Sequence, residues 1–215
     1  MPANLLSGNY QKKCIKGSKF LSSLDQDWNS LVSSVGPCKL NLSIELEPYQ
    51  ALIKSVIFQQ LRPASATAIF NRFKQNFDNN FPTEEKILAS PESKLKESGL
   101  SFNKRKTIIE IARHVQKGEL ENRQNFLIMN DSQIIEKLTK IKGIGEWTAQ
   151  MLMIFNLGKL DVFPAGDFAL RKNYSLFKSI ASPLTMRELS KISEEWKPFR
   201  SIAAWYLWRY KNILN

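Results

Sequence analysis

Apolar residues recur every three or four positions over most of the chain, the spacing that predicts amphipathic α-helices. Pro48 suits the first position of one such helix, because its missing N–H costs nothing there. The apolar stripe that follows consists of Leu52, Ile53, Val56 and Ile57. Proline, glycine and capping residues divide the rest of the chain in the same way. Further helices are predicted to start at Pro63, Thr83, Ser90, Ser101, Asp131, Trp147, Asp167, Thr185 and Phe199.

One segment alternates between apolar and polar positions, as a strand would. Its apolar residues are Leu40, Leu42, Ile44 and Leu46. No second segment offers it a partner, and a lone strand is not stable. We therefore expect an extended linker here and an all-α fold of about ten helices.

The residue inventory narrows the chemistry. The chain has 215 residues, with Cys14 and Cys38 as its cysteines and His114 as its histidine. This excludes a Cys/His zinc site, a four-cysteine iron–sulfur cluster and a disulfide scaffold. No window approaches the run of about 20 apolar residues that a membrane helix needs, and the N-terminus lacks a signal-peptide pattern. Catalysis would have to use carboxylates, lysines, hydroxyls or the backbone.

The charge balance points to a polyanionic partner. Lysine and arginine total 31 against 20 acidic residues, which gives a net charge of +11. Such a surplus favours nucleic acid first and an anionic membrane surface second, and simple solubility is the alternative explanation.

The most distinctive local motif is a short turn between two predicted helices. Gly143 and Gly145 flank Ile144, which can anchor the turn in the core. The amides of the turn and of the next helical turn would then point outward together and could bind a phosphate. Nearby positive charge comes from Lys137, Lys140 and Lys142. The alternative is an ordinary helix–helix connection that uses glycine as a C-cap.

Asp167 follows Phe-Pro-Ala-Gly and opens a predicted helix. An aspartate in this position is commonly just an N-cap. The helix N-terminus also favours its ionised form. An ionised carboxylate can stabilise a sugar oxocarbenium ion and orient or deprotonate a water molecule.

Together these motifs make the chain resemble the helix-hairpin-helix DNA glycosylase superfamily, and within it the alkylation-repair branch, DNA-3-methyladenine glycosylase II. The resemblance covers about residues 35–210. The matching stretches are Val35-Gly-Pro-Cys38, Ile57-Phe-Gln-Gln-Leu61, Ile69-Phe-Asn-Arg-Phe73, Phe81-Pro-Thr, Gly99-Leu-Ser, Lys142-Gly-Ile-Gly-Glu-Trp-Thr-Ala149, Asp161-Val-Phe-Pro-Ala-Gly-Asp167, Leu170-Arg171, Trp196-Lys-Pro-Phe-Arg-Ser201 and Ala204-Trp-Tyr-Leu-Trp208.

The resemblance implies two helical lobes with the active-site cleft between them. One lobe would span residues 48–159 and contain the helix-hairpin-helix at about 131–157. Residues 1–47 and 160–215 would form the other lobe, which carries the catalytic Asp167. Family members flip a damaged nucleotide out of the duplex and cut its N-glycosidic bond.

The resemblance also implies roles for individual residues. Leu61 would be the wedge that fills the gap left by the flipped base, and packing of Leu61 in the core is the alternative. The residues expected to contact DNA are Gln60, Leu61, Lys142, Gly143, Ile144, Gly145, Thr148 and Arg171. Arg171, Lys172 and Arg200 can be either DNA-backbone or structural cations. The backbone carbonyls of Thr139, Ile141 and Gly143 would hold a structural Na⁺ or K⁺, and no cofactor for the chemistry is expected.

Position 147 separates the reaction types within this superfamily. Branches that also cleave the strand carry a Schiff-base lysine there, whereas this chain has Trp147, and Lys142 on the other side of the turn does not replace it. A monofunctional enzyme is therefore implied. Trp147 and Trp208 would form the base pocket, where an indole face attracts a cationic methylated purine. Core packing is the alternative for both. Met151 stands where some relatives carry an aromatic residue.

The leading hypothesis is excision of alkylated purines such as 3-methyladenine and 7-methylguanine from double-stranded DNA in base excision repair. The expected protein is a monomer with no membrane partner, in the cytoplasm or nucleoid of a prokaryote or the nucleus of a eukaryote. One alternative is a catalytically silent helix-hairpin-helix module that only binds DNA. Another is a glycosylase for deaminated or oxidised bases.

Overall fold

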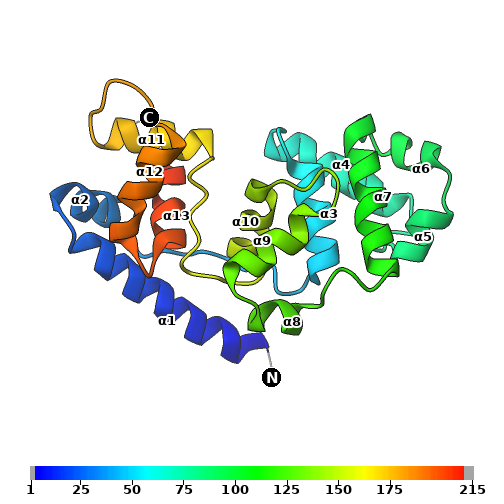
Figure 1. Cartoon of the computed structure of the whole chain (residues 1–215), viewed down its shortest axis with the longest axis horizontal. Coiled ribbons are helices and arrows are strands. Elements are labelled where there is room, and N and C mark those ends of the chain that lie inside the picture. The colour runs from blue at the N-terminus through cyan, green and yellow to red at the C-terminus, as the bar shows by residue number, and fades with distance from the viewer. Residues whose placement is uncertain (1–2, 211–215) are drawn as a thin grey trace. The chain divides into compact units, whose positions relative to one another are not determined.

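The computed structural model describes residues 3–210, and the side chains of residues 8–210. Over this range the chain consists of α-helices, one 3₁₀ helix (η1) and loops, without a strand (Figure 1). The bounds are α1 Ala3–Ser22, α2 Gln26–Val35, α3 Pro48–Phe58, α4 Pro63–Gln75, α5 Glu84–Ala89, α6 Glu92–Glu97, α7 Phe102–Gln116, α8 Arg123–Ile128, α9 Asp131–Thr139, α10 Glu146–Phe155, α11 Phe168–Phe177, α12 Met186–Ile192, η1 Ser193–Trp196 and α13 Arg200–Tyr210. The all-α prediction is confirmed.

Most of the predicted helix starts are confirmed. Pro48 and Pro63 are the first residues of α3 and α4. Thr83 caps α5 by accepting a hydrogen bond from the Lys86 amide. Thr185 caps α12, where it forms a capping box with the glutamate three residues later.

Asp131 is not the cap of α9, contrary to prediction. Its neighbour Asn130 accepts from the Gln133 amide at 2.9 Å, and the Gln133 side chain accepts from the Asn130 amide at 3.0 Å. This reciprocal pair is a capping box, which satisfies two backbone N–H donors at once. The N-cap is therefore Asn130, one residue before the predicted one. Three helices, α1, α2 and the short α8, were not predicted from the sequence.

The segment from Leu40 to Leu46 is not a strand, as predicted, but only its first part is an extended linker, because residues 44–46 form a turn in which the Leu46 amide donates to the Ser43 carbonyl at 3.2 Å. Leu40 is nevertheless buried, so the linker contributes one apolar side chain to the core. Among the described residues, no helix combines the length and apolarity that crossing a membrane requires.

The chain divides into two compact units, each described by itself. Unit 1 comprises Met1–Leu42 and Met153–Asn215, and unit 2 comprises Ser43–Leu152, so that the division falls within α10. The predicted lobe boundaries at residues 48 and 160 fall a few residues later than these.

Unit 1 is built around α13, which contacts α1, α2 and α11. All seven residues from Ser201 to Leu207 are buried, as expected for a central helix rather than a surface one. Beside it lies an aromatic cluster centred on Trp196, whose ring centroid is 5.4 Å from that of Trp28 and 5.1 Å from that of Phe163. Edge-to-face packing of this kind adds stability beyond the buried area.

Unit 2 is built around α7, which contacts α3, α5 and α6. A second aromatic cluster forms where α4 ends. Phe73 is completely buried there, with ring centroids 5.5 Å from Phe77 and 5.8 Å from Phe81. The stability of this unit therefore depends on large side chains that fill its core.

Replacement of Phe73 by alanine should lower the free energy of unfolding by about 3–5 kcal/mol, because it removes buried area and leaves a cavity. Phe102 is the matched control, since it is 53% exposed and contacts Lys106 only through a cation–π interaction at 4.2 Å. Phe102→Ala should cost less than about 1 kcal/mol. Urea unfolding measures both values, and equal losses would contradict the proposed core.

Candidate functional site

The turn between α9 and α10 has the conformation that its glycines suggest. Gly143 has a φ of +94°, a backbone region that favours glycine. A Cβ added at Gly143 would also lie only 2.9 Å from the Thr107 Cβ of α7, so glycine lets the turn approach that helix. At Gly145 an added Cβ would meet nothing within 4 Å. The first glycine therefore serves the fold, whereas the second leaves the outer face of the turn open.

Ile144 anchors the turn, as predicted. Its side chain is 4% exposed, and its amide donates to the Ile141 carbonyl at 2.9 Å. Lys142, Gly143 and Gly145 are exposed beside it. The turn and the N-terminus of α10 thus present backbone to the outside, where helix N-termini bind anions.

The three lysines near the turn differ in their surroundings. Lys137 pairs with Glu121 at 3.0 Å, and Lys140 pairs with Glu136 at 3.1 Å. All three lysines place positive charge near the turn, as expected, although two of them have a carboxylate beside them. Lys142 is exposed at the turn itself.

Leu61 lies on the surface, in a turn that follows α3. It is 38% exposed, which argues against packing in the core and fits the wedge prediction. Gln60 precedes it with a φ of +55° and is also exposed. We refer to Gln59–Leu61 as the wedge turn. Its first residue, Gln59, donates from Nε2 to Thr148 Oγ1 at 2.8 Å.

Thr148 was predicted to contact DNA, but its side chain is 3% exposed and its hydroxyl accepts the bond from Gln59. Only its backbone amide, in the first turn of α10, could serve that role. Trp147 is 38% exposed in the same turn, so core packing does not account for it. Met151, one turn further along α10, is 9% exposed. Residues four apart lie on one face of a helix, as the pocket prediction requires.

Trp208 lies on α13 in unit 1 and is half-buried. Its ring stacks on Phe155, with centroids 5.7 Å apart and planes 30° apart. The sequence analysis had not singled out Phe155. Its position in the apolar stripe of α10 pointed only to packing.

Asp167 is the N-cap of α11, and its Oδ1 accepts from the Leu170 amide at 3.1 Å. The plain capping role is therefore real. The carboxylate is nevertheless only half-buried, and its neighbours Gly166 and Phe168 are exposed, Phe168 by 60%. A carboxylate that caps a helix with one oxygen, on a residue that is only half-buried, is held in a fixed position close to the surface.

The segment that leads to Asp167 is held by the first turn of α13. Arg200 donates from Nε to Asp161 Oδ1 at 2.8 Å and from Nη2 to Asp161 Oδ2 at 3.0 Å. Ser201 Oγ accepts from the Val162 amide at 2.9 Å. Bidentate arginine–carboxylate pairs are among the strongest and most directional polar contacts. Arg200 therefore has a structural role in this segment, which is one of the two roles that the sequence left open for it.

Arg171, predicted to contact DNA, is half-buried on α11. Its Nη1 donates to the Leu184 carbonyl at 3.3 Å, and its guanidinium lies 5.5 Å from the Phe168 ring centroid. Arg171 is therefore partly engaged within unit 1. Lys172 is exposed.

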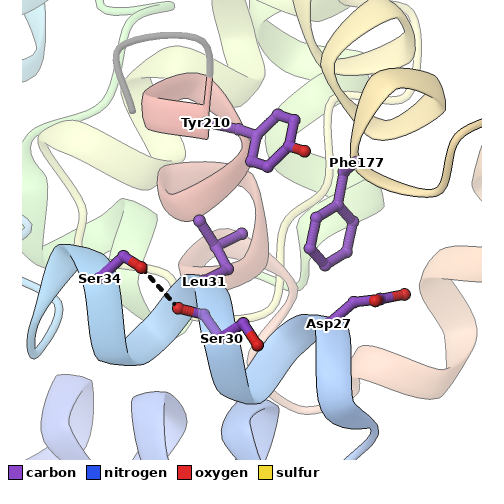
Figure 2. Close-up of a pocket in the computed structure, with 6 residues that line it drawn as sticks. All are labelled: Asp27, Ser30, Leu31, Ser34, Phe177 and Tyr210. Atoms are coloured by element: carbon purple, nitrogen blue, oxygen red, sulfur yellow. Dashed lines mark hydrogen bonds between the residues drawn. The ribbon is translucent and has the colours of Figure 1, made fainter. Parts of the chain in front are cut away.

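A pocket of about 170 Å³ lies elsewhere in unit 1, between α2, α11 and α13 (Figure 2). Its lining residues are Asp27, Ser30, Leu31, Ser34, Phe177 and Tyr210. Phe177 ends α11, whereas Asp167 caps the start of this helix, roughly 15 Å away at 1.5 Å per residue. None of the residues predicted for the site lines this pocket.

The described residues contain no group of three or more His, Cys, Asp or Glu side chains that could hold a metal ion. This leaves open the backbone site expected at the turn. Thr139 is the last residue of α9, where helix carbonyls lack partners within the helix. The Ile141 carbonyl accepts from the Ile144 amide.

Comparison with known proteins identifies relatives along most of the chain. Residues 53–198 match the family described as "HhH-GPD superfamily base excision DNA repair protein". "DNA-3-methyladenine glycosylase 1" of Schizosaccharomyces pombe is 40% identical over 202 residues, which cover 93% of this chain and 89% of that protein. "Alkylbase DNA glycosidase-like protein mag2" of the same organism is 37% identical, over 92% of this chain and 94% of that one.

A solved structure agrees with these sequence relatives. The S. pombe 3-methyladenine DNA glycosylase Mag1, in complex with abasic DNA, superposes with a TM-score of 0.85 and 39% identity. The match covers 90% of this chain and 95% of that chain.

The two glycines of the turn should respond differently to substitution. Gly143→Ala should lower the free energy of unfolding by at least about 2 kcal/mol, because it combines a positive φ with a clash against Thr107. Gly145→Ala should change it by less than about 1 kcal/mol, since a Cβ fits there. Thermal unfolding of both variants checks this, and a larger loss for Gly145→Ala would refute the assignment.

Proposed function

Because the chain belongs to the HhH-GPD superfamily of base excision DNA repair proteins, we propose that it is a monofunctional DNA glycosylase that excises alkylated purines such as 3-methyladenine and 7-methylguanine. The observation that carries the proposal is the position of Asp167. Its carboxylate is fixed by a helix N-terminus, in a segment clamped by Arg200 and Ser201, and still reaches the surface. The names of the relatives support the alkylated-base substrate class.

The chemistry follows from the charge of the substrate. A purine alkylated on a ring nitrogen is cationic, so it departs with the electron pair of the N-glycosidic bond and becomes neutral. Positive charge then develops on the deoxyribose, where the Asp167 carboxylate stabilises it. A water molecule adds to the anomeric carbon and loses its proton to Asp167, which leaves an abasic site.

Unit 2 would supply the contacts to DNA. The outward amides of the turn and of the N-terminus of α10 suit a backbone phosphate, and the exposed Lys142 adds positive charge. Leu61 is exposed as an intercalating wedge requires. The open space around Gly145 allows a phosphate to come close to the main chain.

Aromatic residues would select the flipped base. Trp147 exposes part of its indole at the start of α10, and an indole face attracts a cationic purine more strongly than a neutral one. Within unit 1, Trp208 stacks on Phe155, and this aromatic pair is a further candidate for contact with the base. Deaminated or oxidised bases are neutral and would need more specific hydrogen bonds, so alkylated purines are the better match.

A monovalent cation at the turn is part of the proposal. The carbonyl oxygens of Thr139, Ile141 and Gly143 would hold Na⁺ or K⁺, and the uncharged donor set fits a weakly bound monovalent ion. Thr139 supports this, because its carbonyl is at the C-terminal end of α9, the negative end of the helix dipole. Such an ion would neutralise phosphate charge and take no part in bond cleavage.

Release of free base separates this proposal from a module that only binds DNA. The purified protein is incubated with methylated duplex DNA, and free 3-methyladenine and 7-methylguanine are measured. Binding without release of either base would favour the silent module. Release only from deaminated or oxidised DNA would favour the third hypothesis.

Asp167→Asn should reduce single-turnover base release by at least about 100-fold, because it removes the charge that stabilises the transition state. Folding and DNA affinity should persist, since asparagine caps helices as well as aspartate does. Asp78→Asn is the matched control: Asp78 is exposed with a φ of +57°, which asparagine also tolerates. Near-normal release by Asp167→Asn would overturn the assignment.

No covalent adduct should form when borohydride is added during turnover. Strand-cleaving relatives use a lysine Schiff base, and the corresponding position here is Trp147. A lysine-dependent glycosylase run in parallel serves as the positive control. Trapping of this protein on DNA would instead establish a lysine mechanism and exclude the monofunctional assignment.

A further inference from the structure

Leu61 is the exposed leucine of the wedge turn, and residues of two other helices, α7 and α10, form hydrogen bonds with this turn. We propose that Lys104 of α7 is a positioning residue for base flipping, which fixes the wedge turn so that Leu61 can be driven into the duplex. This inference rests on the proposed function, because it concerns the step that precedes bond cleavage. All of its residues belong to unit 2.

Lys104 binds the end of α3 directly. Its Nζ donates to the Ile57 carbonyl at 2.8 Å and to the Gln59 carbonyl at 2.9 Å. Carbonyls at a helix C-terminus lack donors within the helix and form the negative end of its dipole. The Lys104 ammonium donates hydrogen bonds to these carbonyls and places a positive charge at the negative end of the helix dipole. Lys104 is half-buried, so its ammonium is partly withdrawn from solvent, which lowers its pKa, and the two carbonyls hold it at the end of α3.

The wedge turn is held by a second contact from α10. Gln59 Nε2 donates to the buried Thr148 hydroxyl at 2.8 Å. Lys104 and Thr148 therefore fix the main chain and the side chain of the same residue, one from each neighbouring helix. The bond to Thr148 also joins the wedge turn to the helix that begins just after the glycine turn.

The turn itself cannot supply this rigidity. Gln60 has a φ of +55°, which is unfavourable for a residue with a side chain. The bond from the Leu61 amide to the Phe58 carbonyl is long, at 3.4 Å. A wedge must resist the stacked bases that it separates, so a turn with weak internal bonds needs outside support. Lys104 supplies that support without touching DNA.

The test compares two duplexes that carry the same alkylated purine. In one the lesion is paired, and in the other it lies opposite an abasic site, where it is already unpaired and easier to extrude. Lys104→Met, which keeps a flexible chain without donors, should slow single-turnover release from the paired lesion by at least about 10-fold. Release from the unpaired lesion should change by less than about 3-fold. Lys104→Arg should recover part of the loss, because guanidinium can also donate to both carbonyls.

Lys106→Met is the charge-matched control. Lys106 is exposed two residues further along α7 and lies over the Phe102 ring, away from the wedge turn. It should release base from both duplexes at the normal rate. The salt dependence of DNA affinity should keep its slope in Lys104→Met, because no phosphate contact is lost. A shallower slope would mean that Lys104 binds phosphate, which would overturn the inference.

Equal losses on both duplexes would also overturn it, since they would indicate a general structural defect. If Lys104→Met fails to fold, Thr148→Val replaces it in the test, because it removes the other contact to Gln59. Thr148→Val should then slow release from the paired lesion and leave release from the unpaired lesion nearly unchanged. Fluorescence of 2-aminopurine beside the lesion reports unstacking directly. If the wild-type protein unstacks DNA but releases no base, the proposed function is refuted while the role of Lys104 can still be tested. In that case Lys104→Met must reduce the fluorescence change, or the inference about Lys104 is refuted as well.

Discussion

Backbone groups at helix ends have no partners within their own helix, and this constraint explains where the residues proposed for the site lie. The start of α11 receives the Asp167 carboxylate. The end of α3 receives the Lys104 ammonium. The start of α10 is exposed from Gly145 to Trp147, and the N-terminus of a helix favours an anion. In an all-α protein such ends are the main places where backbone polarity is available for recognition, so the site is assembled from them.

Under the proposed function the Asp167 carboxylate would serve two purposes, and its surroundings make them compatible. Capping uses one oxygen and tolerates either aspartate or asparagine, whereas stabilising a sugar cation requires the negative charge. The cap alone would fix only the Asp167 end of the segment that runs from Asp161 to Asp167. The bidentate bond between Arg200 and Asp161 fixes the other end, so the carboxylate need not reorganise as charge develops.

Local sequence signals predicted local structure well. Pro48, Thr83 and Thr185 mark helix starts because a single residue type satisfies the backbone there. Contacts between distant segments were not predictable in this way. Arg200 and Asp161 are 39 residues apart, and Gln59 and Thr148 are 89 apart, so no spacing rule connects them. The motifs indicated which segments matter, and the folded chain was needed to show that Arg200 supports the site.

The net charge of +11 is a weaker guide to the DNA-binding surface than the composition implies. Lys137 and Lys140 are engaged by glutamates, and Lys104 is engaged by carbonyls. Each of these cations has a partner within the protein, although the Lys140 pair is exposed and such surface pairs contribute little stability. Recognition would then depend more on main-chain amides, whose position is fixed by folding, than on flexible lysines. Rigid donors would suit the proposed function, in which the protein holds the duplex while a side chain enters between stacked bases.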